Sequence, residues 1–264
     1  MHGATLDPVL AVLSPAKRLE FDAECPFVPT VAPLLKETKK LSEVTRKLSL
    51  SDLRQLMKLS VPLSQLNVER FASFKATARP VGAKPAVWAF DGDTYTGLRA
   101  RSFSEAQMRY AQDHLRILSG LYGLLRPLDA ILPYRLEMGT RLGTSRGSTL
   151  YDFWGDLIAR QLNSSLKSAG TQVLLNLASQ EYFQAVDCSA LRAQVVTPHF
   201  KERRGRTLKV ISFSAKRARG AMARYLIEQR ATEPAQLMGF RGDGYRFDKS
   251  LSDETNLVFV REQP

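Results

Sequence analysis

Three segments of the chain share a pattern that suits a ligand site: a short apolar run ends at a serine, and charged or aromatic residues follow. They are LAVLSPAK ending at Lys17, LLNLASQEYF at 174–183 and KVISFSAKRARG at 209–220. In open α/β sheets, ligands gather at the carboxyl ends of strands, where backbone N–H groups and helix N-termini converge. If the three runs are neighbouring parallel strands, one crevice receives Ser14, Lys17, Asn176, Ser179, Glu181, Tyr182, Ser214 and Lys216. Serine also commonly caps the helix that follows a strand, which would explain each case separately.

A crevice of this composition could hold a small anionic substrate. Cationic side chains would steer and bind the anion, and acidic or phenolic groups would transfer protons. Under this interpretation the chain is an enzyme, and its chemistry falls to Lys17, Asn176, Glu181, Tyr182 and Arg135. The sequence assigns no reaction, so these residues are candidates for an alternative function.

Positive charge is the most informative feature of the composition. The 264 residues include 38 Lys or Arg against 26 Asp or Glu, a net charge of +12. Between Lys201 and Arg230 the chain has ten Lys or Arg and two Glu, a net charge of +8 in 30 residues. So local an excess predicts an anionic partner, although a solvated basic surface would have the same composition.

The basic segment is predicted to form a hairpin followed by a helix. QVVTPHF and RTLKVISF flank KERRG, with Gly205 at the tip, and the helix is expected to run from Ser214 to Arg230. At about 100° per residue, Gly220 falls outside the apolar arc, where it would let another backbone approach closely. The cations that also fall outside the arc are Lys216, Arg217, Arg219, Arg224 and Arg230. This side of the helix would suit phosphate groups.

The stretch ILSGLYGLLRPLDAILPYRLEMG, residues 117–139, places glycines and prolines in an apolar run. Gly120 and Gly123 follow a helix expected over 104–118, and a turn without Cβ atoms would let backbone N–H groups reach phosphate oxygens. A helix C-cap with a tight packing turn would use the same two glycines. Arg135 and Glu137 form either a buried ion pair or part of a cleft lining.

The remaining patterns predict a mixed α/β (α+β) fold with a mixed sheet and flanking helices. We expect a single compact domain over residues 9–264 and an extended tail over 1–8. Predicted strands cover 8–13, 86–90, 172–179 and a final pair, YRFD and NLVFVR. Predicted helices cover 33–74, with a break near Ser49 and Ser51, and 149–170, ending at Gly170.

Several other classes of protein do not fit the sequence. Cys25 and Cys188 are isolated and the three histidines lack metal-ligand spacing, so neither a metal nor a cofactor is expected. The longest apolar runs are too short to span a bilayer, and the N-terminal residues lack a basic leader. We therefore expect a cytoplasmic protein without a membrane partner.

Several blocks of the chain are similar to the YaaA family of bacterial peroxide-stress-resistance proteins. They are residues 117–139, SPAK (14–17), DGDTYTGL (91–98), LYDFWGD (150–156), NLASQEYF (176–183), FSAKRARG (213–220) and GFRGDGYRF (239–247). The resemblance implies a mixed α/β single domain, a positively charged cleft that binds duplex DNA, and a helix-hairpin-helix element. It also implies a role in limiting oxidative damage, associated with lower free intracellular iron, and no firmly assigned enzymatic activity.

These observations predict a monomeric protein that binds duplex or structured DNA without strong sequence specificity, because no base-reading element is evident. The helix-hairpin-helix element would consist of helix 104–118, the turn SGLYG and the segment LLRPLD. The expected phosphate contacts are Arg203, Arg204, Lys209, Lys216, Arg217, Arg219 and Arg224, with a backbone clamp of Gly120, Tyr122, Gly123 and Arg126. An enzyme for a small anionic substrate is the alternative.

Overall fold

Eight strands of residues 8–262, the part of the chain that the computed structural model describes, form one sheet. Its strand order is β11-β12-β9-β8-β1-β5-β6, and β10 pairs with β9. The strands are β1 (Leu10–Leu13), β5 (Leu115–Ser119), β6 (Gly123–Leu125), β8 (Val173–Leu177), β9 (Gln194–Arg204), β10 (Thr207–Lys209), β11 (Arg246–Phe247) and β12 (Asn256–Glu262). Two short antiparallel pairs lie outside this sheet: β2 (Arg18–Leu19) with β4 (Phe90–Asp91), and β3 (Lys84–Pro85) with β7 (Ala130–Ile131).

The five central strands are parallel, so their carboxyl ends meet at one edge of the sheet. β12, β9, β8, β1 and β5 run in the same direction, whereas β11 and β6 are antiparallel to their neighbours. Every residue of β1 is buried, as expected for a parallel strand that is covered on both faces. The chain segments that leave β1 and β8 at this edge therefore start side by side.

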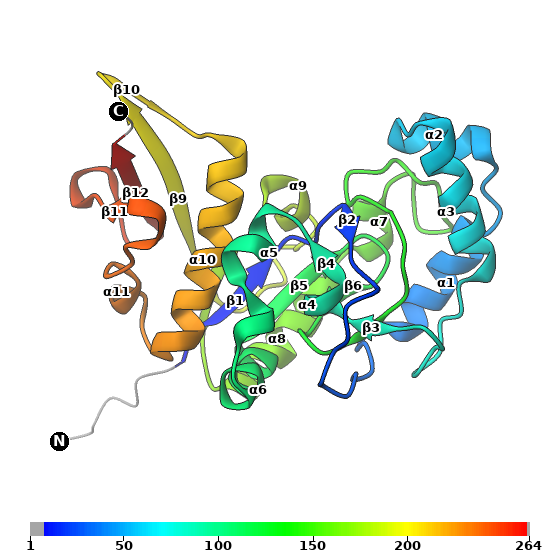
Figure 1. The fold of residues 1–264 in the computed structure, drawn as a ribbon, viewed down its shortest axis with the longest axis horizontal. Helices are drawn as coiled ribbons and strands as arrows, with labels where there is room; N and C mark the ends of the chain where they lie inside the picture. Colours follow the sequence, from blue (N-terminus) through cyan, green and yellow to red (C-terminus); the bar gives the residue numbers. More distant parts are fainter. Residues whose placement is uncertain (1–7, 263–264) are drawn as a thin grey trace.

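Helices cover the sheet. α10 packs across β1, β8 and β9, in front of the sheet in Figure 1, and α8 packs on β1 and β6. The helices are α1 (Leu35–Thr45), α2 (Leu50–Met57), α3 (Val61–Ser73), α4 (Ala86–Ala89), α5 (Asp93–Leu98), α6 (Glu105–His114), α7 (Leu150–Trp154), α8 (Leu157–Ala169), α9 (Gln180–Phe183), α10 (Ser212–Gln229) and α11 (Pro234–Leu237). Within residues 8–262, no helix has both the length and the apolar composition needed to cross a membrane.

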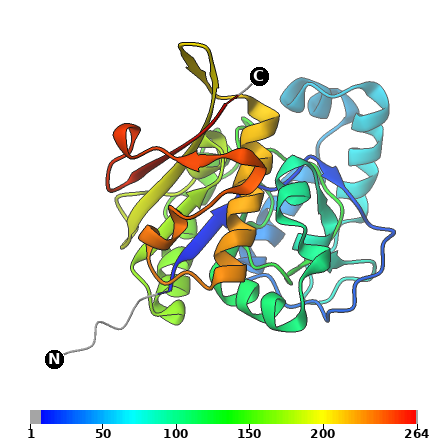
Figure 2. The same cartoon turned by 60° about the vertical axis from the view of Figure 1, so that its left-hand side comes forward.

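Two parts of the chain project on opposite sides of the carboxyl edge of the sheet. The hairpin of β9 and β10 stands at one side, above the start of α10, and the three helices α1–α3 stand at the other (Figures 1 and 2). The segments that follow β1 and β8, together with α5 and α9, lie between them in Figure 1. The sheet edge is therefore flanked by two raised parts of the molecule.

The predicted fold class and most predicted elements are confirmed. The chain forms a mixed α/β fold around one hydrophobic core, with parallel strands at two of the three expected serine-ended runs, β1 and β8. Helices begin after Ser49 and Ser104, each of which forms a capping box with the residue three positions later. The hairpin tip is at Gly205, and α8 ends at Gly170. The expected tail, residues 1–8, lies outside the described residues except for Pro8.

Several predictions of secondary structure are wrong, mostly in apolar segments. AVWA, expected in a strand, forms α4, and Leu115–Ser119, expected at the end of a helix, forms β5. The helix expected over 149–170 is broken at Gly155, which has a φ of 46°. The third serine-ended run is not a parallel strand, because β10 ends at Lys209 and α10 begins at Ser212. Short buried apolar runs carry no periodicity that separates a strand from a helix.

A buried ion pair fixes the start of α10 to the sheet. Arg261 of β12 donates hydrogen bonds to Glu202 of β9 at 2.6 Å and to Ser214 Oγ of α10 at 3.0 Å. Burial alone would raise the pKa of Glu202, but hydrogen bonds from Ser214 and Arg261 outweigh it and hold the pKa below its usual value. The beginning of the basic helix is therefore anchored above the carboxyl edge.

We predict that Glu202→Gln lowers the free energy of unfolding at pH 7 by about 1.5–3 kcal/mol, because Arg261 loses a charge-assisted partner. A carboxyl group with a lowered pKa stabilises the fold above its unfolded pKa, about 4.3 for Glu, and this contribution is lost as the pH falls through the folded pKa. The difference from wild type should therefore be constant from pH 7 to about 5 and shrink below about 4. Urea unfolding across this range measures it.

The exposed Glu254 supplies the matched control. Glu254→Gln should stay within about 0.5 kcal/mol of the wild type. Equal unfolding curves for the two variants would mean that the buried pair does not hold α10 in place.

Candidate functional site at the carboxyl edge of the sheet

A cavity of about 630 Å³ opens where β1 and β8 end. We call it the strand-end cavity. Five segments line it: the residues that follow β1, the end of β4 with the start of α5, the segment that contains Glu137, the end of β8 with the residues that follow it, and the start of α10. Its polar lining consists of Ser14, Lys17, Arg18, Asp91, Asp93, Thr94, Thr96, Glu137, Ser179, Gln180, Glu181, Tyr182, Lys216 and Arg219. The volume lies in the usual range for small-molecule sites.

Hydrogen bonds between the two strand ends form the floor of the strand-end cavity. The parallel register pairs Leu13 with Leu177, so Ser14 and Ser179 follow at neighbouring positions. The backbone N–H of Ser179 donates to Ser14 Oγ at 2.8 Å, and Tyr95 Oη donates to the Ser14 carbonyl at 3.1 Å. Ser14 is thus committed to holding the strands and α5 together.

A close helix crossing forms one side of the strand-end cavity. α5 and α10 pack with Gly97 against the backbone of Arg217 and with Gly220 against the backbone of Thr94. A Cβ atom on Gly220 would lie 1.7 Å from the Thr94 carbonyl oxygen, and one on Gly97 would lie 2.0 Å from that of Arg217. The predicted close approach of a backbone to Gly220 is confirmed, but the backbone belongs to α5, and Gly220 is buried rather than exposed.

Half of the charged side chains in the strand-end cavity are in ion pairs with one another. Lys17 lies 2.9 Å from Glu137, which also accepts a hydrogen bond from Arg135 at 3.1 Å. Arg18 lies 2.7 Å from Asp91. These pairs hold the segment after β1 against its neighbours, so Lys17, Arg18 and Arg135 have much of their charge neutralised before any ligand binds.

Lys216 and Arg219 differ from these cations, because neither has an ion-pair partner within residues 8–262. Lys216 is exposed, and Arg219 is half-buried in the cavity lining. Burial lowers the pKa of Arg219 from its usual value, which reflects the cost of holding an uncompensated guanidinium away from water. These two side chains are available to an anion.

The strand-end cavity holds binding groups rather than an activated nucleophile. Its lining, as far as the structure describes it, includes no histidine or cysteine. Lys17 is exposed and paired, so it lacks the desolvation that activates a lysine nucleophile. Burial raises the pKa of Tyr182 well above its usual value, so its phenol stays protonated. The arrangement can bind charged and hydroxylated groups.

The predicted crevice is largely assembled. The strand-end cavity brings together Ser14, Lys17, Ser179, Glu181, Tyr182 and Lys216. Asn176 lines a neighbouring cavity, and Ser214 is buried against Arg261. Arg135 borders a small recess beside Lys17 and Tyr182.

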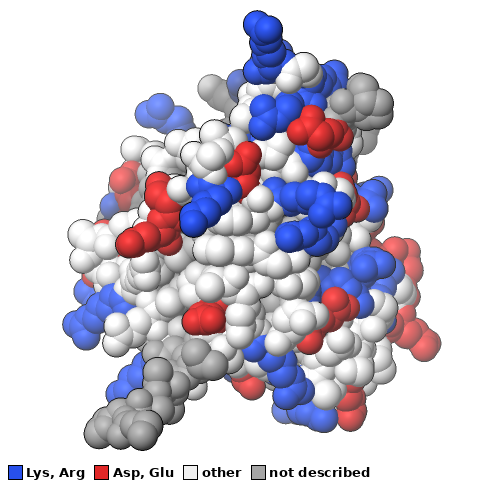
Figure 3. Space-filling model, turned by 90° about the vertical axis from the view of Figure 1, so that its left-hand side faces the viewer, with Lys and Arg blue, Asp and Glu red and all other residues white. Residues whose placement is uncertain are grey.

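The cations predicted to contact phosphates fall into two groups. Arg203, Arg217 and Arg224 form ion pairs with Glu262, Asp243 and Glu228 respectively, and Arg224 also donates to the carbonyls of Leu98 and Arg99. Arg204 and Lys209, on the hairpin, are exposed. Figure 3 shows acidic side chains interspersed among the basic ones on the face that bears α10 and β12. The segment 201–230 is therefore not one continuous basic strip.

The predicted helix-hairpin-helix at residues 104–129 is absent from the described structure. β5 and β6 form an antiparallel hairpin, and Gly120, Tyr122 and Gly123 in its turn are buried. A Cβ atom on Gly120 would lie 2.2 Å from the Leu136 carbonyl oxygen, and one on Gly123 would lie 2.7 Å from the Trp154 ring. These glycines permit close packing, the alternative that the sequence left open, and their backbones cannot reach phosphates.

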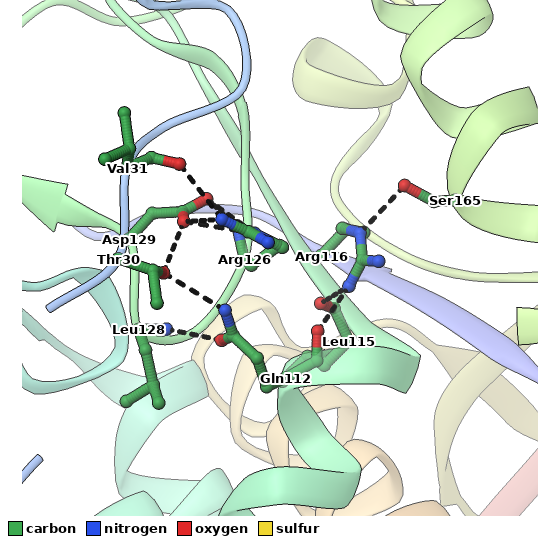
Figure 4. Close-up of polar contacts among 9 residues, drawn as sticks. All are labelled: Thr30, Val31, Gln112, Leu115, Arg116, Arg126, Leu128, Asp129 and Ser165. Atoms are coloured by element: carbon green, nitrogen blue, oxygen red, sulfur yellow. Dashed lines mark hydrogen bonds and ion pairs between the residues drawn. The ribbon is translucent and has the colours of Figure 1, made fainter. Parts of the chain in front are cut away.

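Arg126 is also committed to the fold (Figure 4). Its guanidinium lies 2.8 Å from the carboxylate of Asp129, which is fully buried, and it donates to the Val31 carbonyl at 3.0 Å. Asp129 also accepts a hydrogen bond from Thr30 at 2.7 Å. Removing Arg126 would leave a buried carboxylate without its cation. The backbone clamp predicted from the sequence is therefore wrong.

Two features of the site were missed from the sequence. The carboxylates Asp91 and Asp93 line the strand-end cavity; both lie in DGDTYTGL, which served only to indicate the family. Glu137, for which a place in a cleft lining was one of the two expectations, lines the cavity as well. α2 and α3 form a helical hairpin joined by residues 58–60, where Lys58 has a φ of 52°. A lysine in that conformation is uncommon, and the pattern of leucines gave no sign of it.

Within residues 8–262, no group of three or more His, Cys, Asp or Glu side chains is placed to hold a metal ion.

We predict that Gly220→Ala destabilises the fold by about 1–3 kcal/mol, because the new methyl group overpacks the α5–α10 crossing. An alanine would otherwise favour a helix by up to about 1 kcal/mol, so a loss of stability isolates the crossing. Gly143→Ala is the control, since nothing lies within 4 Å of its added Cβ. Thermal and urea unfolding compare the two. A Gly220→Ala protein as stable as the control would show that α5 and α10 can separate freely.

Residues 9–251 match the family model described as peroxide stress protein YaaA. A UPF0246 protein of Dinoroseobacter shibae is 55% identical over 256 residues, which cover 97% of this chain and 96% of the relative. UPF0246 proteins of Caulobacter vibrioides and Saccharophagus degradans are 52% and 48% identical, over 97% of this chain and 100% of each relative. The chain therefore belongs to the YaaA family of peroxide stress proteins.

Proposed function

We propose that this chain, as a monomer, binds duplex or structured DNA as part of the peroxide-stress role of its family. The observation that carries the proposal is the distribution of unpaired cations. They gather on both sides of the strand-end cavity, on the two raised parts of the molecule. A polyanion lying across the carboxyl edge would meet positive charge on each side.

The first side consists of the β9–β10 hairpin and the start of α10. Arg204 and Lys209 are exposed on the hairpin, and Lys216 and Arg219 follow on the helix. α10 is an 18-residue helix, and the positive end of its dipole lies at this side. Phosphate groups would replace the water that solvates these cations, with release of counterions from the DNA.

The second side was not recognised in the sequence. Residues 36–79 contain ten Lys or Arg against four Asp or Glu, a net charge of +6. At the end of α3, a cavity of about 540 Å³ is lined by Arg70, Lys75 and Arg79 and by no described acidic residue. Burial lowers the pKa of Arg70. Three cations around one hollow, without a carboxylate, favour an anionic ligand.

The two sides are linked by one chain segment. Leu132 and Pro133 line the cavity at the end of α3, and Glu137 lines the strand-end cavity. Five residues of extended chain span at most about 18 Å. The two cavities are thus close enough for one DNA molecule to contact both.

The helical hairpin of α2 and α3 supports contact with the DNA backbone. Ser60 precedes the 13-residue helix α3 and makes no side-chain cap hydrogen bond, so the backbone N–H groups of Val61 and Leu63 remain available, whereas Pro62 has none. Phosphate groups bind readily to such helix starts. In this proposal the element that the family resemblance implied lies at residues 50–73.

We predict that log K for a 20-base-pair duplex falls linearly with log salt concentration, with a slope of about −0.9 per phosphate contact. Arg204→Gln, Lys75→Gln and Lys216→Gln should each reduce the size of the slope by about one contact, because each removes one cation from the proposed path. Fluorescence anisotropy of labelled DNA measures the affinities.

Arg230→Gln is the matched control. Arg230 is exposed and lies at the opposite end of α10 from Lys216. The substitution therefore lowers the net charge by the same amount but lies outside the proposed phosphate contacts. If it alters the slope as much as Arg204→Gln does, binding depends on net charge alone. Absence of binding at about 50 mM salt would refute the proposal.

A second function is favoured by the enclosed part of the site. Paired carboxylates and cations beside an unpaired, half-buried arginine also suit a small anionic substrate. Under this alternative, Lys17→Ala abolishes the survival of peroxide-treated cells and leaves the affinity for DNA unchanged, because Lys17 belongs to the site chemistry. Lys167→Ala, at an exposed position of α8, is the control. Normal peroxide survival of the Lys17→Ala strain would exclude this alternative.

A further inference from the structure

A second cavity adjoins the strand-end cavity, and the two share Gln180 and Arg219 in their linings. We call it the amide cavity, and its volume is about 520 Å³. It lies over β8 and β9, beside α9. Its polar and aromatic lining consists of Asn176, Gln180, Phe183, Gln184, Thr197, His199 and Arg219. A half-buried guanidinium therefore stands where the two cavities meet.

The two cavities differ in charge. Among its described lining residues, the amide cavity has no carboxylate and no lysine, and Arg219 is its one cation. The strand-end cavity instead contains four carboxylates and four cations. A ligand that spans both would carry its charge at one end and uncharged hydrogen-bonding groups at the other.

The hydrogen-bonding groups of the amide cavity can be assigned. Asn256 donates its amide N–H groups to Asp253 at 3.0–3.1 Å, and these contacts, together with hydrogen bonds from Thr255 and from the Asn256 backbone, lower the pKa of Asp253 to about 2. The Asn256 Oδ1 atom is therefore an acceptor, so the Nε2–H of His199, 3.0 Å away, donates to it. With Nε2 as the donor, Nδ1 is the acceptor of a neutral His199 imidazole.

Donors complement this acceptor. Asn176 accepts a hydrogen bond from Ala178 N through Oδ1, at 3.1 Å, which leaves its Nδ2 donor group free. Gln180 and Gln184 each contribute an amide with both a donor and an acceptor, and Phe183 contributes an aromatic ring. Such a combination recognises a flat heterocycle by its edge and by stacking on its face.

The strand-end cavity supplies what a phosphorylated sugar requires. Lys216 and Arg219 are cations without ion-pair partners in the described residues, and Arg219 can reach an anion from the junction. Asp93 and Glu181 are carboxylates outside the ion pairs of the cavity. Carboxylates accept hydrogen bonds from sugar hydroxyl groups, as they do in dinucleotide sites.

We infer that the two cavities form one nucleotide site, with the base in the amide cavity and the phosphate at Arg219 and Lys216. The nucleotide is either a free nucleoside monophosphate or one unpaired nucleotide of a DNA strand. Only the second source rests on the proposed function. Extruding a base from DNA costs least where the base is mispaired or damaged, so the site would select such positions.

The test measures two ligands with the same variants. Isothermal titration calorimetry measures the affinity for deoxyadenosine monophosphate and, separately, for inorganic phosphate. Fluorescence anisotropy measures the affinity for a duplex that carries one unpaired adenine and for the fully paired duplex. Gln180→Leu/Gln184→Leu removes two amides from exposed positions of α9 and its C-terminal end. Gln229→Leu, at the far end of α10, is the matched control.

We expect the wild type and the control to bind deoxyadenosine monophosphate more tightly than inorganic phosphate, or the unpaired-adenine duplex more tightly than the paired duplex. In either case the ratio of affinities should be on the order of ten, the effect of two hydrogen bonds from the amides. The double variant should lose this factor and keep its affinity for inorganic phosphate and for the paired duplex. If the double variant loses only the preference for the free nucleotide, the ligand is a free nucleotide; if it loses only the preference for the unpaired-adenine duplex, the ligand is a nucleotide of DNA.

If neither preference exists in the wild type, or neither changes in the double variant, the inference is overturned. Failure of the proposed function has a different signature, since the wild type would then bind no duplex at all while the titration with the free nucleotide proceeds independently.

Discussion

The candidate site depends on the contact between α5 and α10 at Gly97 and Gly220. Helices normally pack about 8–10 Å apart because side chains separate them, but here each helix presents a glycine to a carbonyl oxygen of the other. This contact brings Asp93 and Thr94 of α5 beside Lys216 and Arg219 of α10. Any larger residue at either glycine would move the cations relative to the strand ends. The positions of the charged side chains in the cavity therefore depend on a packing contact between two helices that involves no charge.

Ion pairs then decide which cations remain available to a ligand. Arg203, Arg217 and Arg224 are paired, and Arg126 neutralises a buried aspartate. Counting charges along the chain cannot make this distinction, because two of the partners, Asp243 and Glu262, come from segments that are distant in the sequence. A cation that holds the fold together must lose its partner before it binds a phosphate, whereas Lys216 and Arg219 need only lose water. The charge that is available to a phosphate therefore lies in different places from those that a count along the chain indicates.

The sequence allowed the floor of the site to be predicted, but not its walls. β1 and β8 are recognisable as apolar runs, and parallel strands end at a common edge, so Ser14 and Ser179 could be placed together. Gly220 was misplaced because helical periodicity identifies only the side that faces the sheet, and α5 covers another side. Leu115–Ser119 and AVWA were misassigned because a short buried run fits either a strand or a helix. The helical hairpin at 58–60 escaped notice because nothing in its sequence requires a left-handed lysine.

The division of the site into a charged and an uncharged cavity bears on how such a protein could find particular places on DNA. Cations on the hairpin and on α1–α3 would attract any phosphate backbone, independently of sequence. Attraction of that kind cannot tell an intact duplex from an altered one. The amide cavity could distinguish them, because its amide groups and its histidine acceptor form their hydrogen bonds only with a matching base. Arg219 stands at the junction, where a phosphate held by the first cavity would position its base at the entrance of the second. Affinity and discrimination would then reside in different residues, so that substitutions in one cavity could alter either property alone.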